Sequence, residues 1–254
     1  MGINSDDLSN LNEKARRLRV DSLNLAVEEE GGHLGGAFSS AEIFVALFDN
    51  ILKTEDRFIL SKGHSCNPYY QKLRERGYNP QTLLHPERDV SNGIYCATGS
   101  LGHGLPVAAG MAWARKLLGI KGDVYVLVGD GEIQEGTTWE TSLFAANHGL
   151  DNLIAVLDKN GIQGSGFVKD ILPLPTNLER ILSDLGWSTS TIDGHNFEEI
   201  IPSLEKRYGG RPRFVIANTV KGKGVSFMEN NPSWHGGVPK ADDLILAYEE
   251  LKRR

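Results

Sequence analysis

The sequence predicts an α/β protein with a mostly parallel sheet that is covered by helices on both faces. From Gly104 onward, short aliphatic and β-branched runs (YVLV, NLIAVL, RFVIANTV) alternate with longer segments of helical periodicity. Continuous apolar strands are typical of parallel sheets buried on both faces, and their alternation with helices is typical of α/β folds. Because no linker or low-complexity tract divides the 254 residues, we expect a single domain over residues 1–254.

The N-terminal part is expected to be mainly helical. Apolar residues at helical spacing predict a helix over Leu8–Glu30, with Ser5 or Asp6 as N-cap and Gly31-Gly32 as its end. After the turn GGHLGG the pattern predicts a helix from Ser39 or Ser40 through Leu52, a strand Arg57–Leu60 and a helix Asn67–Arg76. Residues 78–104 show no periodicity, and a loop of this length in a compact domain is usually functional.

The C-terminal part supplies the strand and helix alternation. The predicted strands are Val124–Val128, Leu153–Leu157, Trp187–Ile192 and Arg213–Thr219. The predicted helices are Pro106–Leu118, Glu135–His148, Asn177–Leu185, Phe197–Tyr208 and Asp242–Lys252.

Composition excludes several classes of function. The net charge is −6 and the basic residues are scattered, so we expect no nucleic-acid partner. No apolar run approaches the ~20 residues that span a bilayer, and the polar N-terminus does not resemble a signal peptide. Cys66 and Cys96 lack metal-ligand spacing. A cytoplasmic protein without a membrane partner fits these observations best.

Polar side chains follow the predicted strands at the edge where α/β sheets bind ligands. Asp130 lies in a Gly-Asp-Gly turn after YVLV, and Asn160 follows NLIAVL one strand–helix–strand unit later, so both are expected at the same sheet edge. Their oxygens, with a backbone carbonyl from the next turn, suit Mg²⁺, and the adjoining glycines suit a phosphate. An isolated GDG is more often only a tight turn, but the second residue at the right offset favours a site.

The histidines form a second group of candidate residues. Most of the seven adjoin a glycine and are therefore expected in turns: His33, His64, His85, His103, His148, His195 and His235. A single loop histidine is more often a capping or hydrogen-bonding residue, whereas several of them at one sheet edge favour a site that moves protons. Spacing alone does not tell which of them converge.

Common nucleotide and hydrolase motifs are missing from the sequence. GDGEIQEG lacks the G-x-G-x-x-G spacing of dinucleotide sites, and no G-x-x-x-x-G-K-[ST] run is found. G-x-S-x-G and H-E-x-x-H motifs are also missing.

Six ordered segments resemble the transketolase family. GDGEIQEGTTWE through DKNGIQ resembles its thiamine diphosphate motif, and TGSLGHGLPVAAGMA resembles its glycine-rich diphosphate loop. GGHLGGAFSSAEI, RFILSKGH and LLHPE are similar to its histidine turns, and KGKGVSFMENNPSWHG to its closing segment. The resemblance covers nearly the whole chain and implies the family's thiamine diphosphate-binding fold.

The resemblance implies roles for individual residues. It implies Mg²⁺, or another divalent cation such as Ca²⁺ or Mn²⁺, on Asp130, Asn160 and the Ile162 carbonyl. It implies thiamine diphosphate contacts by His64, Gly99, Ser100, Leu101, Gly129, Asp130, Gly131, Glu132, Asn160, Ile162 and His235. It implies catalytic roles for His33, His85, His235 and Glu135, with the histidines binding sugar oxygens and Glu135 joining a carboxylate network across a subunit interface. His103 stands where many relatives carry glutamine, so it receives no role.

The implied reaction transfers a two-carbon ketol unit from a ketose or ketose phosphate to an aldose, by means of the cofactor's thiazolium carbanion. A full transketolase continues with a pyrimidine-binding and a C-terminal domain, which implies that the partner is a separate C-terminal subunit, with two copies of each chain. The alternatives are the α subunit of a 2-oxo acid dehydrogenase, a relative of deoxyxylulose-phosphate synthase, and a non-catalytic regulatory paralogue. TGSLGHG and SWHG resemble ketose-handling segments and favour transketolase over the dehydrogenase.

Overall fold

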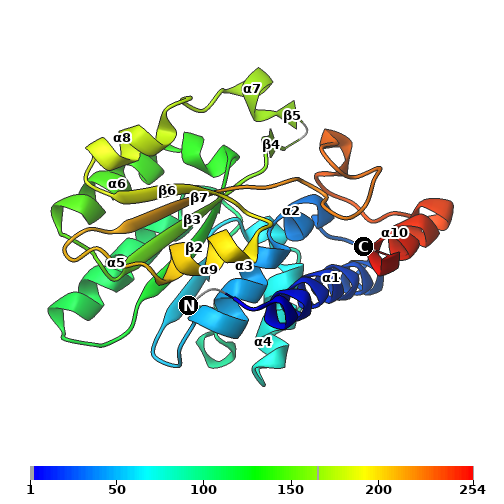
Figure 1. The fold of residues 1–254 in the computed structure, drawn as a ribbon, viewed down its shortest axis with the longest axis horizontal. Coiled ribbons are helices and arrows are strands. Elements are labelled where there is room, and N and C mark those ends of the chain that lie inside the picture. Colours follow the sequence, from blue (N-terminus) through cyan, green and yellow to red (C-terminus); the bar gives the residue numbers. More distant parts are fainter. Residues whose placement is uncertain (1–2, 165, 254) are drawn as a thin grey trace.

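A five-stranded parallel sheet forms the centre of the protein, as predicted. The computed structural model describes residues 3–164 and 166–253. The strands lie in the order β1-β2-β3-β7-β6, and all neighbours are parallel. Their bounds are β1 Arg57–Leu60, β2 Val124–Gly129, β3 Leu153–Lys159, β6 Ser188–Asp193 and β7 Arg213–Asn218. Figure 1 shows the twisted sheet with helices on either side.

Helices cover both faces of the sheet because successive strand residues point in opposite directions. Val124, Val126 and Val128 of β2 pack in one apolar cluster, whereas Tyr125 and Leu127 pack in another. The first face is covered by α5 Gly104–Leu117, α6 Gly136–Asn147 and α8 Leu178–Asp184. The second is covered by α1 Ser5–Glu28, α3 Ala41–Val45, η1 Ala46–Ile51, α4 Asn67–Glu75 and α9 Phe197–Glu205.

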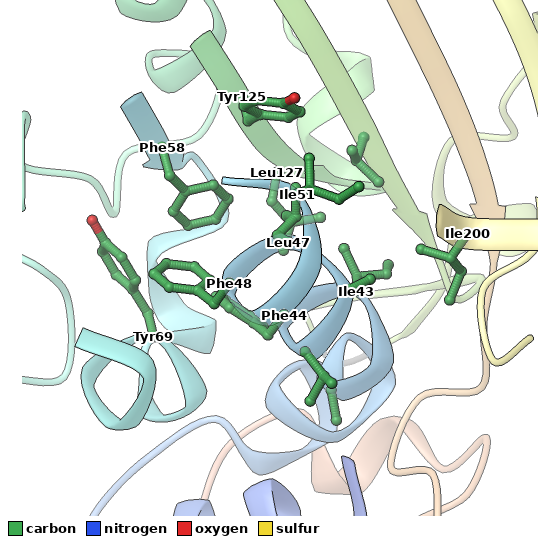
Figure 2. Packing of buried hydrophobic residues seen from close by; sticks show 14 of the residues in the cluster. Ile43, Phe44, Leu47, Phe48, Ile51, Phe58, Tyr69, Tyr125, Leu127 and Ile200 are labelled. Carbon is green, nitrogen blue, oxygen red and sulfur yellow. The ribbon is translucent and has the colours of Figure 1, made fainter. Parts of the chain in front are cut away.

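Aromatic side chains fill the second face. Figure 2 shows Phe44, Phe48, Phe58 and Tyr69 packed together beneath Tyr125. The ring centroids of Phe58 and Tyr69 lie 5.2 Å apart and those of Phe48 and Phe58 lie 5.3 Å apart, both edge to face. This geometry adds a specific attraction to the burial of apolar area. The cluster therefore fixes α3, η1 and α4 against the sheet.

A third apolar cluster joins α1 to α10 Ala241–Arg253 and to α2 Leu34–Ser39. The remaining short elements are β4 Ile162–Gln163, β5 Gly166–Phe167, α7 Val168–Ile171 and the 3-10 turns η2 Gly63–Ser65, η3 Val90–Asn92, η4 Gly131–Gln134 and η5 Pro232–Trp234. Among the described residues, none of the helices has the length and apolar character needed to cross a membrane.

Two predictions for the N-terminal part were wrong. The GGHLGG segment is not only a turn, because Leu34–Ser39 form the helix α2. Its glycines are required by close packing: a Cβ at Gly35 would lie 2.6 Å from the carbonyl oxygen of Trp234. The next helix widens into a π-helix over Ala46–Ile51. The N-cap of α1 is Asn4, whose side chain accepts from the Asp7 N–H, instead of Ser5 or Asp6.

The segment between α4 and α5 is largely irregular, in agreement with its lack of periodicity. Within residues 76–103, η3 is the one helical or strand element that the structure defines. The segment crosses the end of the sheet and brings His85, Gly99 and Leu101 to a cavity there. It is therefore the loop through which residues remote in sequence reach the candidate site.

We predict that Gly104→Ala lowers the free energy of unfolding by about 1–3 kcal/mol, because the added methyl group would overpack the start of α5. A Cβ at Gly104 would lie 2.6 Å from the Cα of Ser61. Gly110→Ala in the same helix is the matched control. A Cβ there meets nothing within 4 Å, so alanine should stabilise the isolated chain by about 0.5–1 kcal/mol. Urea unfolding compares the two, and equal effects would contradict the packing argument.

Candidate functional site

The ends of β2 and β3 bring Asp130 and Asn160 together. Gly129 of β2 pairs with Asp158 of β3, so the two strands end side by side. The Asn160 N–H donates to Asp130 Oδ1 at 3.1 Å, and the Gly161 N–H donates to Asp130 Oδ2. The Asn160 side-chain oxygen accepts from the Ile162 N–H at 3.1 Å. Carboxylate, amide and carbonyl oxygens thus gather at one edge of the sheet.

Asp130 is held in an environment that disfavours its charge. The residue is only 3% exposed. Burial, followed by the negative charge of Asp158, raises the pKa of Asp130 to about 7, although the N–H groups of Gly161 and Asn160 partly offset this rise. A positive charge placed beside Asp130 would favour its ionised form.

Two buried lysines, which the sequence interpretation did not single out, contribute positive charge to this edge. Lys62 follows β1 and forms an ion pair with Asp158. Lys221 follows β7, and its Nζ lies 3.3 Å from the Ile162 carbonyl oxygen and 2.9 Å from His235 Nδ1. Burial, followed by repulsion from Lys62, lowers the pKa of Lys221 to about 8. Both lysines adjoin glycine at strand ends, in SKGH and VKGK, and this is the signal that could have identified them.

Four histidines, His33, His64, His85 and His235, lie close together near the lysines and Asp130. The ring centroid of His33 lies 5.5 Å from that of His64, 5.6 Å from that of His85 and 5.4 Å from that of His235. The Nδ1 atom of His33 is buried and has no hydrogen-bond partner among the described residues. An unpaired buried nitrogen in such a cluster is available to a ligand.

Burial keeps three members of this cluster, His33, His64 and His235, neutral near pH 7. Burial, followed by Lys221, lowers the pKa of His235 to about 3. Burial, followed by Lys62, lowers the pKa of His64 well below its usual range. Burial, followed by His85, lowers the pKa of His33. Neutral imidazoles can accept a proton, as general bases do.

The other histidines lie elsewhere. His195 Nδ1 lies 3.0 Å from Glu42, and its Nε2 accepts from the Val220 N–H at 2.9 Å. His148 packs against the ring of Phe144, with 4.4 Å between centroids. His103 is exposed at the start of α5. These three histidines therefore lie outside the cluster.

A cavity of about 230 Å³ joins the strand ends to the histidine cluster. Its lining includes most of the residues singled out from the sequence: His33, His64, His85, Gly99, Leu101, Gly129, Asp130, Gly131, Glu132, Asn160, Ile162 and His235. Lys62, Lys221, Gln163 and Gly164 complete the lining. The cavity is smaller than the roughly 300–1,000 Å³ of typical small-molecule pockets, so it suits part of a ligand.

Two of the singled-out residues, Ser100 and Glu135, lie outside the cavity, and Glu132 lines it while its carboxylate faces a neighbouring loop. Ser100 is exposed and does not line the cavity. Glu135 is exposed at the N-cap position of α6, outside the cavity. Glu132 is buried and accepts from Ser61 Oγ and from the Gly102 N–H at 2.9 Å, so it braces the loop beside the cavity.

The donor set fits a hard cation carrying a diphosphate. Asp130, Asn160 and the Ile162 carbonyl offer the oxygen ligands that Mg²⁺ prefers, while Lys62, Lys221 and the N–H of Gly131 suit phosphate oxygens. Within the part of the chain that the structure describes, no group of three or more His, Cys, Asp and Glu side chains is arranged to hold a metal. The proposed ligands differ from such a group, because only Asp130 supplies a carboxylate and the other two oxygens belong to an amide side chain and a backbone carbonyl.

Known proteins share both the sequence and the fold. Residues 9–252 match the family described as transketolase, thiamine diphosphate binding domain. A subunit of apulose-4-phosphate transketolase from Actinobacillus succinogenes is 41% identical, covering 94% of this chain and 94% of the relative. A 6-deoxy-6-sulfo-D-fructose transketolase subunit from Clostridium sp. is 36% identical, covering 90% of this chain and 93% of the relative.

Solved structures of longer transketolases contain the same fold. The transketolase of Campylobacter jejuni is 30% identical with a TM-score of 0.84, and the match covers 98% of this chain and 43% of that chain. The structure of the Leishmania mexicana enzyme gives a TM-score of 0.89 at 24% identity, covering 96% of this chain and 41% of that one. The chain thus spans about two-fifths of these enzymes and nearly all of the two relatives that are single transketolase subunits. On this evidence the chain belongs to the transketolase family.

Proposed function

We propose that the chain is the N-terminal subunit of a thiamine diphosphate-dependent transketolase. It transfers a two-carbon ketol unit from a ketose or ketose phosphate to an aldose, and it acts only with a separate pyrimidine-binding subunit. The observation that carries this proposal is the meeting of Asp130, Asn160 and Ile162 with the four clustered histidines at one cavity. Membership of the family, and the relatives that are named as transketolase subunits, support it.

In this proposal the strand ends bind the diphosphate. Asp130, Asn160 and the Ile162 carbonyl would hold Mg²⁺, or Ca²⁺ or Mn²⁺ in its place. Lys221, His64 and the Gly131 N–H would meet diphosphate oxygens, because each lines the same cavity. Gly99 leaves room beside His85, since a Cβ there would lie 3.1 Å from its ring. Together these groups would hold the diphosphate end of the cofactor beside the histidine cluster.

The histidines would handle the sugar. When bound, thiamine diphosphate supplies a carbanion that cleaves and forms the carbon–carbon bond. His33, His85 and His235 would bind the sugar's hydroxyl and carbonyl oxygens and accept or return protons there. Their burial keeps the rings of His33 and His235 neutral by lowering the pKa of each, and the neutral ring is the form that removes a proton from the donor's hydroxyl.

The need for a partner is supported by an exposed apolar surface, which we name the α5–α6 surface. It is formed by large side chains that are each 38–72% exposed: Val107, Trp113, Leu117, Leu118 and Leu143. Contiguous apolar surface of this kind marks interaction sites. Glu135 begins α6 at one end of this surface, close to Gly102, where a Cβ would lie 2.7 Å from the Glu135 Cβ. A chain bound here would adjoin the cavity.

Gly110 adds a second indication of contact with another chain. It lies in the exposed face of α5, and a Cβ built on it would meet none of the described residues within 4 Å. Glycine in a helix interior costs about 1 kcal/mol relative to alanine, and none of the described residues lies close enough to Gly110 to require it. Close approach of another subunit would supply the reason. We further propose that residues 1–254 form one cytoplasmic domain. The assembly would contain two copies of this chain and two copies of its partner.

Ketol transfer is tested with the chain mixed with a separately encoded chain that carries the remaining transketolase domains. The wild-type pair should transfer ketol units from ketose donors to aldehyde acceptors and should need both chains. His33→Ala should lower kcat by roughly 10²-fold or more, with cofactor affinity changed less than about threefold, because general acid–base groups contribute about that much. Decarboxylation of 2-oxo acids without ketol transfer would contradict the proposal, and so would an effect of His33→Ala confined to cofactor affinity.

The partner surface is tested by charge insertion. Leu117→Glu should weaken binding of the partner chain by about tenfold or more, because an unpaired carboxylate would be buried at the contact. Ile245→Glu on α10 is the matched control, since Ile245 is also exposed, at 59%, but lies outside the α5–α6 surface. Gly110→Ala should weaken association while stabilising the isolated chain. Equal affinities for the Leu117 and Ile245 variants, measured by calorimetry, would place the partner elsewhere.

A pH dependence follows from the raised pKa of Asp130. Its folded-state pKa of about 7 exceeds the ordinary value of 3.8, so its ionisation destabilises the cation-free chain as the pH rises toward 7. Relative to Asp130→Asn, the wild type should lose about 3 kcal/mol of unfolding free energy between pH 5 and pH 8. Added Mg²⁺ with thiamine diphosphate should reduce this loss. Parallel pH profiles of the two proteins in urea unfolding would show that Asp130 is not so perturbed.

A further inference from the structure

The carboxylate of Asp158 lies beneath the cavity without lining it. Asp158 belongs to β3 and is fully buried. It accepts hydrogen bonds from Ser39 Oγ at 2.6 Å, from Lys62 Nζ and from Thr219 Oγ1. These donors come from α2 and from the segments after β1 and β7. Asp158 therefore ties together the ends of several elements around the site.

A fourth donor reaches the same carboxylate from Asn160. The Asn160 Nδ2 atom lies 3.2 Å from Asp158 Oδ2 and 3.4 Å from Ser39 Oγ. An ionised carboxylate only accepts hydrogen bonds, so it pairs with the NH₂ end of the amide and repels the oxygen end. The amide oxygen consequently points to the opposite side, where it accepts from the Ile162 N–H at 3.1 Å. Asp158 on one side and the Ile162 N–H on the other therefore fix the orientation of this amide.

The geometry points to Asp158 as a positioning residue that turns the oxygen of Asn160 toward the divalent cation. The inference rests on the proposed function, in which Asn160 is a ligand of that cation. Without the carboxylate, the amide could turn its NH₂ group to the cation, and a nitrogen that carries two hydrogens offers no lone pair to a hard ion. Residues behind metal ligands commonly contribute 10–100-fold to metal affinity in this way.

Binding of Mn²⁺ in the assembled pair, with saturating thiamine diphosphate, tests the inference. Free Mn²⁺ is measured by electron paramagnetic resonance. Asp158→Asn should weaken Mn²⁺ binding at least about tenfold, whereas Thr219→Val, which removes a hydrogen bond on the side away from Asn160, should change it less than about threefold. The number of waters on Mn²⁺ should rise by about one in Asp158→Asn, as in Asn160→Ala, because a water replaces the amide oxygen.

A rescue variant separates positioning from a structural role. In Asp158→Asn/Asn160→Asp the side chain at position 160 has two oxygens and needs no orientation, so Mn²⁺ affinity should return to within about threefold of wild type. Asp158→Asn leaves Lys62 unpaired, which can prevent folding. In that case Asp158→Asn and Asp158→Asn/Asn160→Asp are compared in a chain that also carries Lys62→Met. Unchanged affinity in Asp158→Asn, or no recovery on adding Asn160→Asp, would overturn the inference. A wild-type pair that binds no Mn²⁺ would instead reject the proposed function.

Discussion

The parallel register between β2 and β3 is the constraint on which the site depends. Gly129 opposes Asp158, so both strands end at one level and the Asp130 carboxylate meets the backbone of Asn160. Apolar residues on both faces hold this register, because a shift by one residue would turn Val126 and Leu127 into the wrong layers. The hydrophobic core on either side of the sheet therefore determines where the polar groups at its edge lie.

Besides Glu132, four ionisable side chains are buried at this edge, Lys62, Asp130, Asp158 and Lys221, and their charges are not equally compensated. Lys62 and Asp158 form an ion pair, which offsets part of the cost of removing both from water. Within the described residues, neither Asp130 nor Lys221 forms such a pair. Burial raises the pKa of Asp130 to about 7 and lowers that of Lys221 to about 8, each toward its neutral form. A cation carrying a diphosphate would supply the opposite charge that each of them lacks.

The sequence predicted the sheet and the meeting of Asp130 with Asn160, because strand composition and the spacing of one strand–helix–strand unit depend on local pattern. It did not predict α2, whose glycines reflect contacts with Trp234 and other distant residues instead of a turn. Residue spacing alone could not separate the four clustered histidines from His148 and His195, and it was the family resemblance that singled those four out, because they reach the cavity from segments far apart in the chain. Lys62 and Asp158 were missed because their pairing joins segments far apart in the chain.

In the proposed function, the oxygens of Asp130, Asn160 and Ile162 hold one divalent cation together with a diphosphate. Anomalous diffraction from crystals of the chain assembled with its partner, soaked with Mn²⁺ and thiamine diphosphate, would locate this cation. We predict a single Mn²⁺ peak within bonding distance of all three oxygens, with diphosphate oxygens completing its coordination. A peak elsewhere, or an Asn160 side chain turned away from the ion, would show that these three oxygens do not form the metal site.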